Sequence, residues 1–267
     1  MRPLLGTFVE ISIEHQTQND AQVSFWFQVA FARLTQLQQR LSIHERNSEL
    51  SAVNLNPYQW LSVSRDTRRL LQLAMILMAK SDGLFNPTLG AALLPDALIP
   101  DFGYGQRALV GSEQALSFRH NQVRLNEPVI VCLDGVAKGF AVDMALATLK
   151  RLGCEHAAIN AGGDIRAMGK RCVPIQTRLQ PSHSGLLHNA ALATSGCYHE
   201  AAFRSRLMDV KGQFLPTQRQ EWSVLAHTAW RADALTKIAA LSQGDEHRLA
   251  KLGGRLLSSP QLGAQLN

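Results

Sequence analysis

The sequence predicts a mixed α/β protein of the α+β class, and three observations support this class. Residues 131–169 contain an apolar run, a helical segment that Gly153 closes and a second apolar run. This is the pattern of a strand, a helix and a strand that returns to the same layer. Two further segments, 23–41 and 64–78, repeat apolar residues at helical spacing. Short runs with strand-like alternation lie near both ends of the chain.

The first part of the chain is expected to form a strand at 8–13, followed by a helix that Asn19 or Asp20 caps. A polar loop should then run into a short helix with Ser48 as its cap, and Ser64 should open a second amphipathic helix after a strand-like piece at 60–63. One stripe of the first helix is expected in the core: Val23, Trp26, Phe27, Ala30, Leu34, Leu37 and Leu41.

Residues 81–105 are rich in Gly, Pro and Asp and have no clear period, which predicts a long ordered loop of a kind that is often functional. A hairpin around His120 and Asn121 should follow it, with strands at 115–118 and 123–125. The rest of the chain predicts strands near Ile175 and at 191–195, 206–210, 222–226 and 255–257, with helices at 229–241 and up to Leu252.

The central helix, which follows Gly135, is apolar on more than one face and should therefore be buried between layers. Its two stripes are Val142, Ala145, Leu146, Leu149 and Leu152 on one side and Phe140, Met144 and Ala147 on the other.

Polar residues punctuate residues 131–169 only at the turns, where a site would be built: Asp134, Lys138, Asp143, Asn160 and Asp164. Two adjacent glycines, Gly162 and Gly163, let a backbone approach a ligand closely and offer N–H groups to phosphate oxygens. The alternative interpretation of these glycines is a tight turn with a capping Asp.

Composition bounds the class of protein. The chain has 267 residues, 46% of them hydrophobic and 18% charged, which suits one large globular domain or two small ones. The net charge of +6 favours anionic ligands or partners, with plain solvation as the alternative. Lys and Arg are scattered without a run of five, so nucleic-acid binding is not indicated.

Cysteine usage and hydropathy indicate a compartment. The four cysteines make no CxxC pair, so neither a zinc ribbon nor a dense disulfide framework is expected, and Cys132, Cys154 and Cys197 should be buried and unpaired. No leader pattern, lipid-attachment motif or run of eighteen apolar residues occurs, so we expect a cytoplasmic protein without a membrane anchor.

Ordered motifs cover nearly the whole chain: Leu5-Gly6-Thr7, residues 44–54 (HERNSELSAVN), 83–90 (GLFNPTLG), 135–143 (GVAKGFAVD), 160–164 (NAGGD), 193–196 (ATSG) and 232–236 (ADALT). Each is weak alone, but their order resembles that of the ApbE family, the FAD:protein FMN transferases, from Leu5 to about Leu257. The resemblance implies a T-fold-like architecture of two intertwined lobes with the FAD cleft between them, and a single functional unit over residues 1–267.

The resemblance also implies an activity, because members of this family use Mg²⁺ and transfer the FMN part of FAD to a Thr or Ser hydroxyl of an acceptor protein, with release of AMP. Phosphoryl transfer of this kind needs positioning and charge neutralisation more than covalent help. An alternative of another class is a protein that keeps the cleft and binds FAD or a related nucleotide without transfer.

The family's functional residues can be assigned to the positions of this chain that match its motifs. The resemblance implies catalytic roles for Asp233, Lys138 and Asp209. It implies a metal site formed by the Gly135 carbonyl, Asp233 and Thr236, which are hard oxygen ligands of the kind Mg²⁺ prefers. The residues implied at FAD are Leu5, His44, Leu84, Phe85, Asn86, Cys132, Asp134, Lys138, Gly162, Gly163, Asp164 and Met208.

Four positions depart from the family pattern. His44 replaces a Tyr at the flavin, Cys132 replaces an Asp that reappears as Asp134, and Arg206 stands where the family has a His. Lys237 replaces a Thr four residues after the metal aspartate, Asp233. The Lys237 ammonium is expected either to swing away from Asp233 or to take the place of the metal. We therefore expect weak or absent Mg²⁺ binding to the protein alone, and partial recovery when FAD brings its phosphates.

Overall fold

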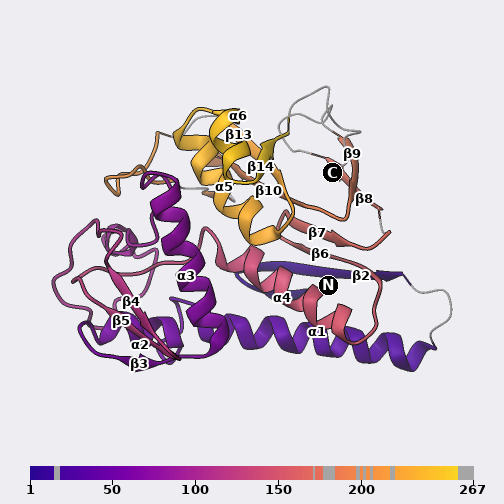
Figure 1. The fold of residues 1–267 in the computed structure, drawn as a ribbon, viewed down its shortest axis with the longest axis horizontal. Coiled ribbons are helices and arrows are strands. Elements are labelled where there is room, and N and C mark those ends of the chain that lie inside the picture. The colour runs from indigo at the N-terminus through magenta and orange to yellow at the C-terminus, as the bar shows by residue number, and fades with distance from the viewer. Residues whose placement is uncertain are drawn as a thin grey trace. The chain divides into compact units, whose positions relative to one another are not determined.

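The computed structural model describes residues 1–14, 19–170, 172–176, 184–196, 199–200, 203–204, 207–216 and 220–257. The chain divides into two compact units, and its mixed α/β class is confirmed (Figure 1). Unit 1 comprises Met1–Gln36, Lys138–Ser205 and Pro216–Asn267, and unit 2 comprises Leu37–Ala137 and Arg206–Leu215. Each unit is therefore built from segments that lie far apart in the sequence.

Unit 1 is organised around a seven-stranded antiparallel sheet with the order β1-β2-β6-β7-β10-β13-β14. Its strands are β1 (Arg2–Leu4), β2 (Thr7–Glu14), β6 (His156–Ala161), β7 (Asp164–Met168), β10 (Ala191–Gly196), β13 (Glu221–Ala226) and β14 (Gly254–Leu256). Two small hairpins accompany it: β8 (Cys172–Gln176) with β9 (Ser184–His188), and β11 (His199–Glu200) with β12 (Phe203–Arg204).

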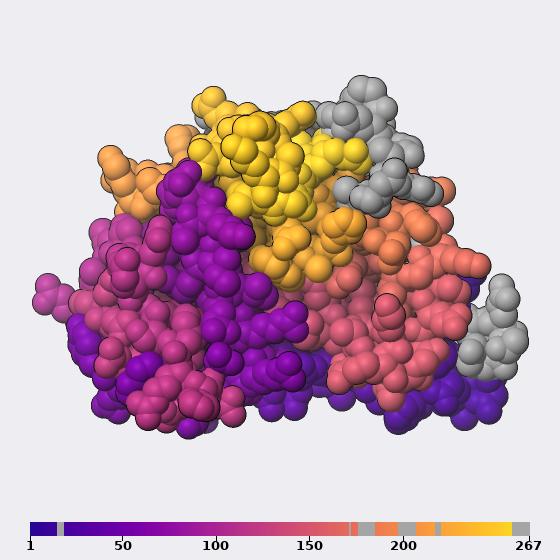
Figure 2. All heavy atoms as spheres, in the orientation of Figure 1, coloured from indigo at the N-terminus to yellow at the C-terminus, as the bar shows by residue number. Residues whose placement is uncertain are grey.

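Helices cover one face of this sheet. The helices of the unit are α1 (Asp20–Leu41, which continues into unit 2), α4 (Ala137–Arg151), α5 (Ala229–Leu241) and α6 (Glu246–Lys251). Helix α5 packs against β10 and β13, and α6 packs against β14. In the space-filling view the orange and yellow atoms of α5 and α6 form one continuous surface (Figure 2).

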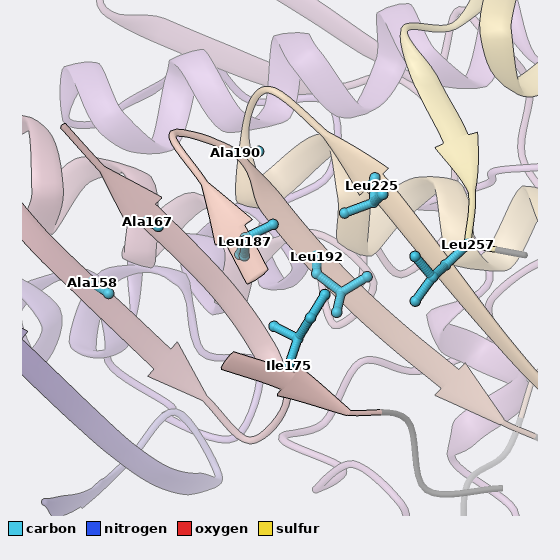
Figure 3. Packing of buried hydrophobic residues seen from close by; sticks show 8 residues of the cluster. All are labelled: Ala158, Ala167, Ile175, Leu187, Ala190, Leu192, Leu225 and Leu257. Carbon is cyan, nitrogen blue, oxygen red and sulfur yellow. The ribbon is translucent and has the colours of Figure 1, made fainter. Parts of the chain in front are cut away.

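The opposite face of the sheet carries an apolar cluster. Strand alternation turns Leu192 and Leu225 away from α5, and Ile175 and Leu187 of the β8–β9 hairpin pack beside them (Figure 3). The cluster is completed by Ala158, Ala167, Ala190 and Leu257. Because both faces of β6 and β10 are covered, each of these strands holds three consecutive buried apolar residues, at 157–159 and 191–193.

Unit 2 holds the shorter elements: α2 (Glu49–Leu55), β3 (Leu61–Ser62), α3 (Arg65–Lys80), a 3₁₀ helix η1 (Gly90–Leu93), β4 (Leu116–Arg119) and β5 (Gln122–Leu125). Both expected caps are confirmed, since Ser48 accepts a hydrogen bond from the backbone N–H of Ser51 and Ser64 accepts one from Thr67. The predicted hairpin is also confirmed, and His120 turns it with a positive φ of 45°.

The first strand predicted in residues 131–169 does not form. Ile130 makes a single parallel bridge to Leu89, and no ladder includes Val131. The side-chain amide of Asn54 donates to the carbonyl oxygen of Val131 at 2.8 Å and accepts from its N–H at 2.8 Å. Because a side chain already satisfies both backbone groups, this apolar segment is a buried extended loop rather than a strand.

Three further expectations need correction. Residues 206–210 are not a strand where they are described, and Met208 makes only an isolated bridge to Phe214. Val23 and Phe27 are half-buried rather than core. Ala147 of the central helix α4 is exposed, as is Leu152 just after the helix, so α4 is buried on a broad face but not all round.

The thiols are only partly as predicted. Cys154 is buried and unpaired, as expected, but Cys132 is half-buried, and Cys197 lies outside the described residues. Among the residues that the structure describes, no helix combines the length and hydropathy needed to cross a membrane.

Candidate active site

Three charged residues of unit 1 meet where α4 begins, where β7 begins and in the second turn of α5. The ammonium nitrogen of Lys138 lies 2.7 Å from Oδ2 of Asp164 and 3.7 Å from Oδ2 of Asp233. The side chains of Asp164 and Asp233 are only 6% and 1% exposed. Buried carboxylates persist in proteins when they are paired with cations, so Lys138 is the group that holds these two together.

A second ammonium, that of Lys237, reaches Asp233 from one helical turn further along α5. It forms an ion pair with Oδ1 of Asp233, and it donates to the Asp233 carbonyl oxygen and to Oγ of Ser195, both at 3.1 Å. Ser195 is on the face of β10 that packs against α5, and its Oγ lies 2.7 Å from Oγ1 of Thr236. The Thr236 hydroxyl donates to the Asp233 carbonyl oxygen at 2.6 Å.

These charges separate the proton affinities of the two carboxylates. Burial, together with the negative charge of Asp233, raises the pKa of Asp164 from 3.8 to about 6, although Lys138 opposes the rise. Burial acts to raise the pKa of Asp233 too, but Lys138 and Lys237 outweigh it and lower that pKa below its usual value. Asp233 is therefore the carboxylate that stays charged, and Asp164 is the one that takes up a proton as the pH falls through about 6.

The junction of α4 and α5 explains two more residues of the 135–143 motif. A Cβ on Gly139 would come within 2.4 Å of the backbone of Ala229, so only glycine lets the two helices approach this closely. Asp143 accepts hydrogen bonds from the N–H groups of Ala229 and Trp230, both at 3.0 Å, and forms an ion pair with Arg166 of β7. Asp143 thus caps α5 from α4, whereas the N-cap residue Thr228 makes no side-chain capping bond.

The Gly162-Gly163 pair is the two-residue turn between β6 and β7, and both glycines have positive φ, of 64° and 104°. Their N–H groups are already used, since Gly162 donates to the carbonyl of Phe8 and Gly163 donates to Oδ1 of Asn160. A Cβ on Gly162 would lie 2.3 Å from Oγ1 of Thr7. The turn interpretation therefore accounts for these glycines, and their N–H groups are not placed to bind phosphate.

Leu5 lies next to this turn. Leu5 and Gly6 form the two-residue turn between β1 and β2, with φ of 56° and 70°. Because β2 pairs antiparallel with β6 in the register Val9 to Ala161, this turn and the glycine turn are at the same end of the sheet. The sheet thus brings together the predicted positions of unit 1, namely Leu5, Gly162, Gly163 and Asp164.

The remaining predicted positions belong to unit 2. Phe85 is buried and Leu84 half-buried, and Oδ1 of Asn86 accepts from the N–H and the hydroxyl of Thr88. The Cys132 N–H donates to the carbonyl of Pro87, so the segments around Asn86 and Cys132 run side by side. A Cβ on Gly90 would lie 2.7 Å from Ile130, which explains why the 83–90 motif ends in glycine.

The Cys132 thiol contacts Asp134, the displaced aspartate. Burial and the neighbouring Asp134 charge raise the pKa of this thiol well above its usual range, so it is neutral at physiological pH. His44 is exposed and Gly135 half-buried. Oδ1 of Asp209 accepts from the N–H groups of Lys211 and Gln213 and closes a turn, while Met208 and Asp209 are both half-buried.

The ApbE family model matches residues 5–254 of this chain. The chain belongs to the ApbE family. The FAD:protein FMN transferase of Haemophilus influenzae is 26% identical over 242 residues, which are 77% of this chain and 69% of that protein. The protein of the same name from Treponema pallidum is 26% identical over 182 residues, 62% of this chain and 50% of that protein.

The fold also matches a solved ApbE structure. The crystal structure of the ApbE protein from Thermotoga maritima superposes with a TM-score of 0.80, at 21% identity, over 95% of this chain and 91% of that one. The mixed α/β architecture that the motifs predicted is thus the ApbE fold.

Two contacts of residues in the ApbE motifs do not follow from the sequence alone. Ser195 binds Lys237; strand alternation from Ala191 and Ala193 places Ser195 on the helix face, but the 193–196 motif does not identify Lys237 as its partner. Asp143 stands out as a charged residue within an apolar helix, which signals a buried partner, but nothing local identifies Arg166 as that partner.

Proposed function

We propose that this ApbE-family protein is an FAD:protein FMN transferase whose acceptor is a Ser or Thr hydroxyl of another protein. The hydroxyl oxygen forms a bond to the FMN phosphorus, the bond from that phosphorus to the bridging oxygen breaks, AMP leaves with this oxygen, and the hydroxyl proton is released. The names of the curated relatives support the reaction, and the charged cluster around Lys138 supports the chemistry.

The observation that carries the proposal is the cation at the start of α4. Lys138 stands in the first turn of the helix, where backbone N–H groups also favour anions, and its two carboxylate partners are buried. A pyrophosphate in this place would meet an ammonium held in position by Asp164 and Asp233, and phosphoryl transfer depends on such fixed charges. In this proposal Asp209 keeps its catalytic role, and the FAD contacts implied by the family motifs are kept for His44, Leu84, Phe85, Asn86, Cys132, Asp134 and Met208.

The Mg²⁺ expected from the resemblance does not fit the contacts at Asp233. The Lys237 ammonium takes Oδ1, and the Thr236 hydroxyl donates to a backbone carbonyl instead of facing the carboxylate. A divalent ion about 4 Å from one ammonium is repelled by roughly 8 kcal/mol at an effective dielectric of 20. No step of the proposed transfer is therefore assigned to a metal bound by Asp233.

A second candidate is FAD or nucleotide binding without transfer, which the Lys237 contact with Asp233 and the replacement of an aspartate by Cys132 favour. The cytoplasmic location and the lack of nucleic-acid binding stay predictions.

The two candidates are separated by incubating the protein with FAD and a Ser- or Thr-containing acceptor peptide, with and without Mg²⁺, and weighing the peptide. Transfer adds the mass of an FMN group and releases AMP. If FAD binds but no Ser- or Thr-containing acceptor peptide gains mass, the result supports flavin binding without transfer instead.

The Lys138→Ala variant tests the role of the Lys138 ammonium, and a titration with FAD measures its effect on binding. We expect FAD binding about tenfold to a hundredfold weaker, because a charged hydrogen bond is lost. The exposed Lys150→Ala variant, on the same helix, is the control. Equal FAD affinity of the Lys138 variant and the parent would remove Lys138 from the site.

A further inference from the structure

The Asp233 site already contains a complete cation shell. An ammonium group has three N–H donors and no acceptor. Those of Lys237 have three oxygen partners: Oδ1 of Asp233, the carbonyl oxygen of Asp233 and Oγ of Ser195. The acidic residue precedes the lysine by four positions, the favoured order for such a pair on a helix. All three N–H donors of the Lys237 ammonium are thus used in hydrogen bonds.

The donor and acceptor roles of the two hydroxyl groups near Lys237, those of Ser195 and Thr236, are also fixed. Thr236 uses its single proton on the carbonyl of Asp233, so the proton between Ser195 and Thr236 must come from Ser195. Ser195 can then only accept from Lys237, which agrees with the observed contact. The chain of hydrogen bonds from Lys237 through Ser195 and Thr236 to Asp233 leaves neither hydroxyl turned toward a metal at the carboxylate.

The other carboxylate oxygen does not offer a metal site either. Oδ2 of Asp233 accepts no hydrogen bond from the described residues, but it faces the Lys138 ammonium at 3.7 Å. Mg²⁺ requires near-octahedral oxygen ligands at about 2.0 to 2.1 Å, so an ion on this oxygen would stand close to that ammonium. Within the part of the chain that the structure describes, no group of three His, Cys, Asp or Glu side chains could hold a metal.

We propose that the Lys237 ammonium is the resident cation of this site, so that Asp233 binds no divalent ion and the protein supplies its own charge where a metal would stand. One lysine therefore separates a metal-free site from a metal site: in Lys237→Thr, the carboxylate and a hydroxyl one turn later become available to a divalent ion. This inference deepens the proposed function, and its meaning for the transfer rests on that function. The occupancy of the site itself does not.

The test is a titration of the full-length protein, free of FAD and acceptor, with Mn²⁺ as a paramagnetic probe for Mg²⁺. The parent should show no saturable site. Lys237→Thr should bind one Mn²⁺ saturably, at least about tenfold more tightly than any binding by the parent, because a repelling charge is replaced by an oxygen ligand. The double variant Lys237→Thr with Asp233→Asn should lose this binding, and the exposed Lys150→Thr, the matched control, should behave as the parent.

Thermal unfolding provides a second readout. Lys237→Thr leaves a buried carboxylate with one cation fewer, so its melting temperature should fall and should then rise with added Mg²⁺, while that of the parent stays constant. A parent that binds one Mn²⁺ saturably and loses it in Asp233→Asn overturns the proposal, even if Lys237→Thr cannot be produced. So does a Lys237→Thr variant that is folded and still binds no ion. Because neither titration contains FAD, both results are independent of whether flavin is transferred in the mass assay.

Discussion

Asp164 shows how a single buried group couples the site to stability. Its raised pKa means that the folded chain holds the proton more tightly than the unfolded chain. The destabilising contribution is therefore absent below the unfolded value of 3.8, grows as pH rises to about 6, and is fully present above that. At roughly 1.4 kcal/mol per pKa unit, the native state loses up to about 3 kcal/mol over this range.

Asp164→Asn, which cannot ionise, should escape this loss. We expect the variant to be more stable than the parent at about pH 7.5, by up to about 3 kcal/mol, with the difference shrinking toward about pH 4. Urea unfolding at the two pH values measures it. Asp233 is present in both proteins, and its lowered pKa stabilises the native state at pH values above its usual pKa. If variant and parent differ in free energy of unfolding by the same amount at both pH values, the assignment to Asp164 is contradicted.

At the scale of elements, the start of α5 depends on a residue of α4. Asp143→Ala leaves two backbone N–H groups and the Arg166 guanidinium without their acceptor, and breaking a buried ion pair from one side costs about 3 to 5 kcal/mol. Chemical denaturation should show a loss of this size. Asp245→Ala is the matched control, because Asp245 caps α6 at an exposed position, where about 1 kcal/mol is expected. Equal losses would show that the α4 cap is unimportant.

The broad buried face of α4 gives the second prediction at this scale. Leu146 is 1% exposed, and truncation to Ala should lower the free energy of unfolding by about 2 to 5 kcal/mol through lost burial and a residual cavity. Leu152, just after the same helix, is 38% exposed, and its truncation should change stability by less than about 0.5 kcal/mol. An unchanged denaturation midpoint for Leu146→Ala would mean that this face of α4 is not packed.

At the scale of the whole molecule, unit 1 cannot be made from one continuous stretch of chain. Strand β6 pairs with β2 over six residues, from Val9 with Ala161 to Glu14 with His156. A fragment of residues 138–267 lacks β1, β2 and α1, so an apolar central strand becomes an edge. We expect this fragment to be poorly soluble and to lack a cooperative unfolding transition. Addition of a peptide of residues 1–36 should improve both, and a fragment that folds alone would show that β2 is dispensable.

Local patterns in the chain are enough to predict most of its elements and its family. Helix periods, the caps at Ser48 and Ser64 and the turn at His120 are set by residues within one or two turns of each other, so a local pattern contains their physical cause. The motif order, from Leu5 to Thr236, was sufficient to predict the ApbE fold.

The roles of several polar groups and apolar runs depend on partners that are distant in the chain. Val131 is as apolar as a strand residue, but an amide 77 positions away takes its backbone hydrogen bonds and prevents a ladder. The Gly162-Gly163 pair reads in the sequence as a possible phosphate-binding turn, but in the fold its N–H groups donate to the Phe8 carbonyl and to Oδ1 of Asn160. Lys237 had two expected positions, and the choice depends on Ser195, 42 residues earlier, which supplies the third acceptor of its ammonium. Hydrogen-bond satisfaction is a property of the assembled site, and no local pattern in the chain encodes it.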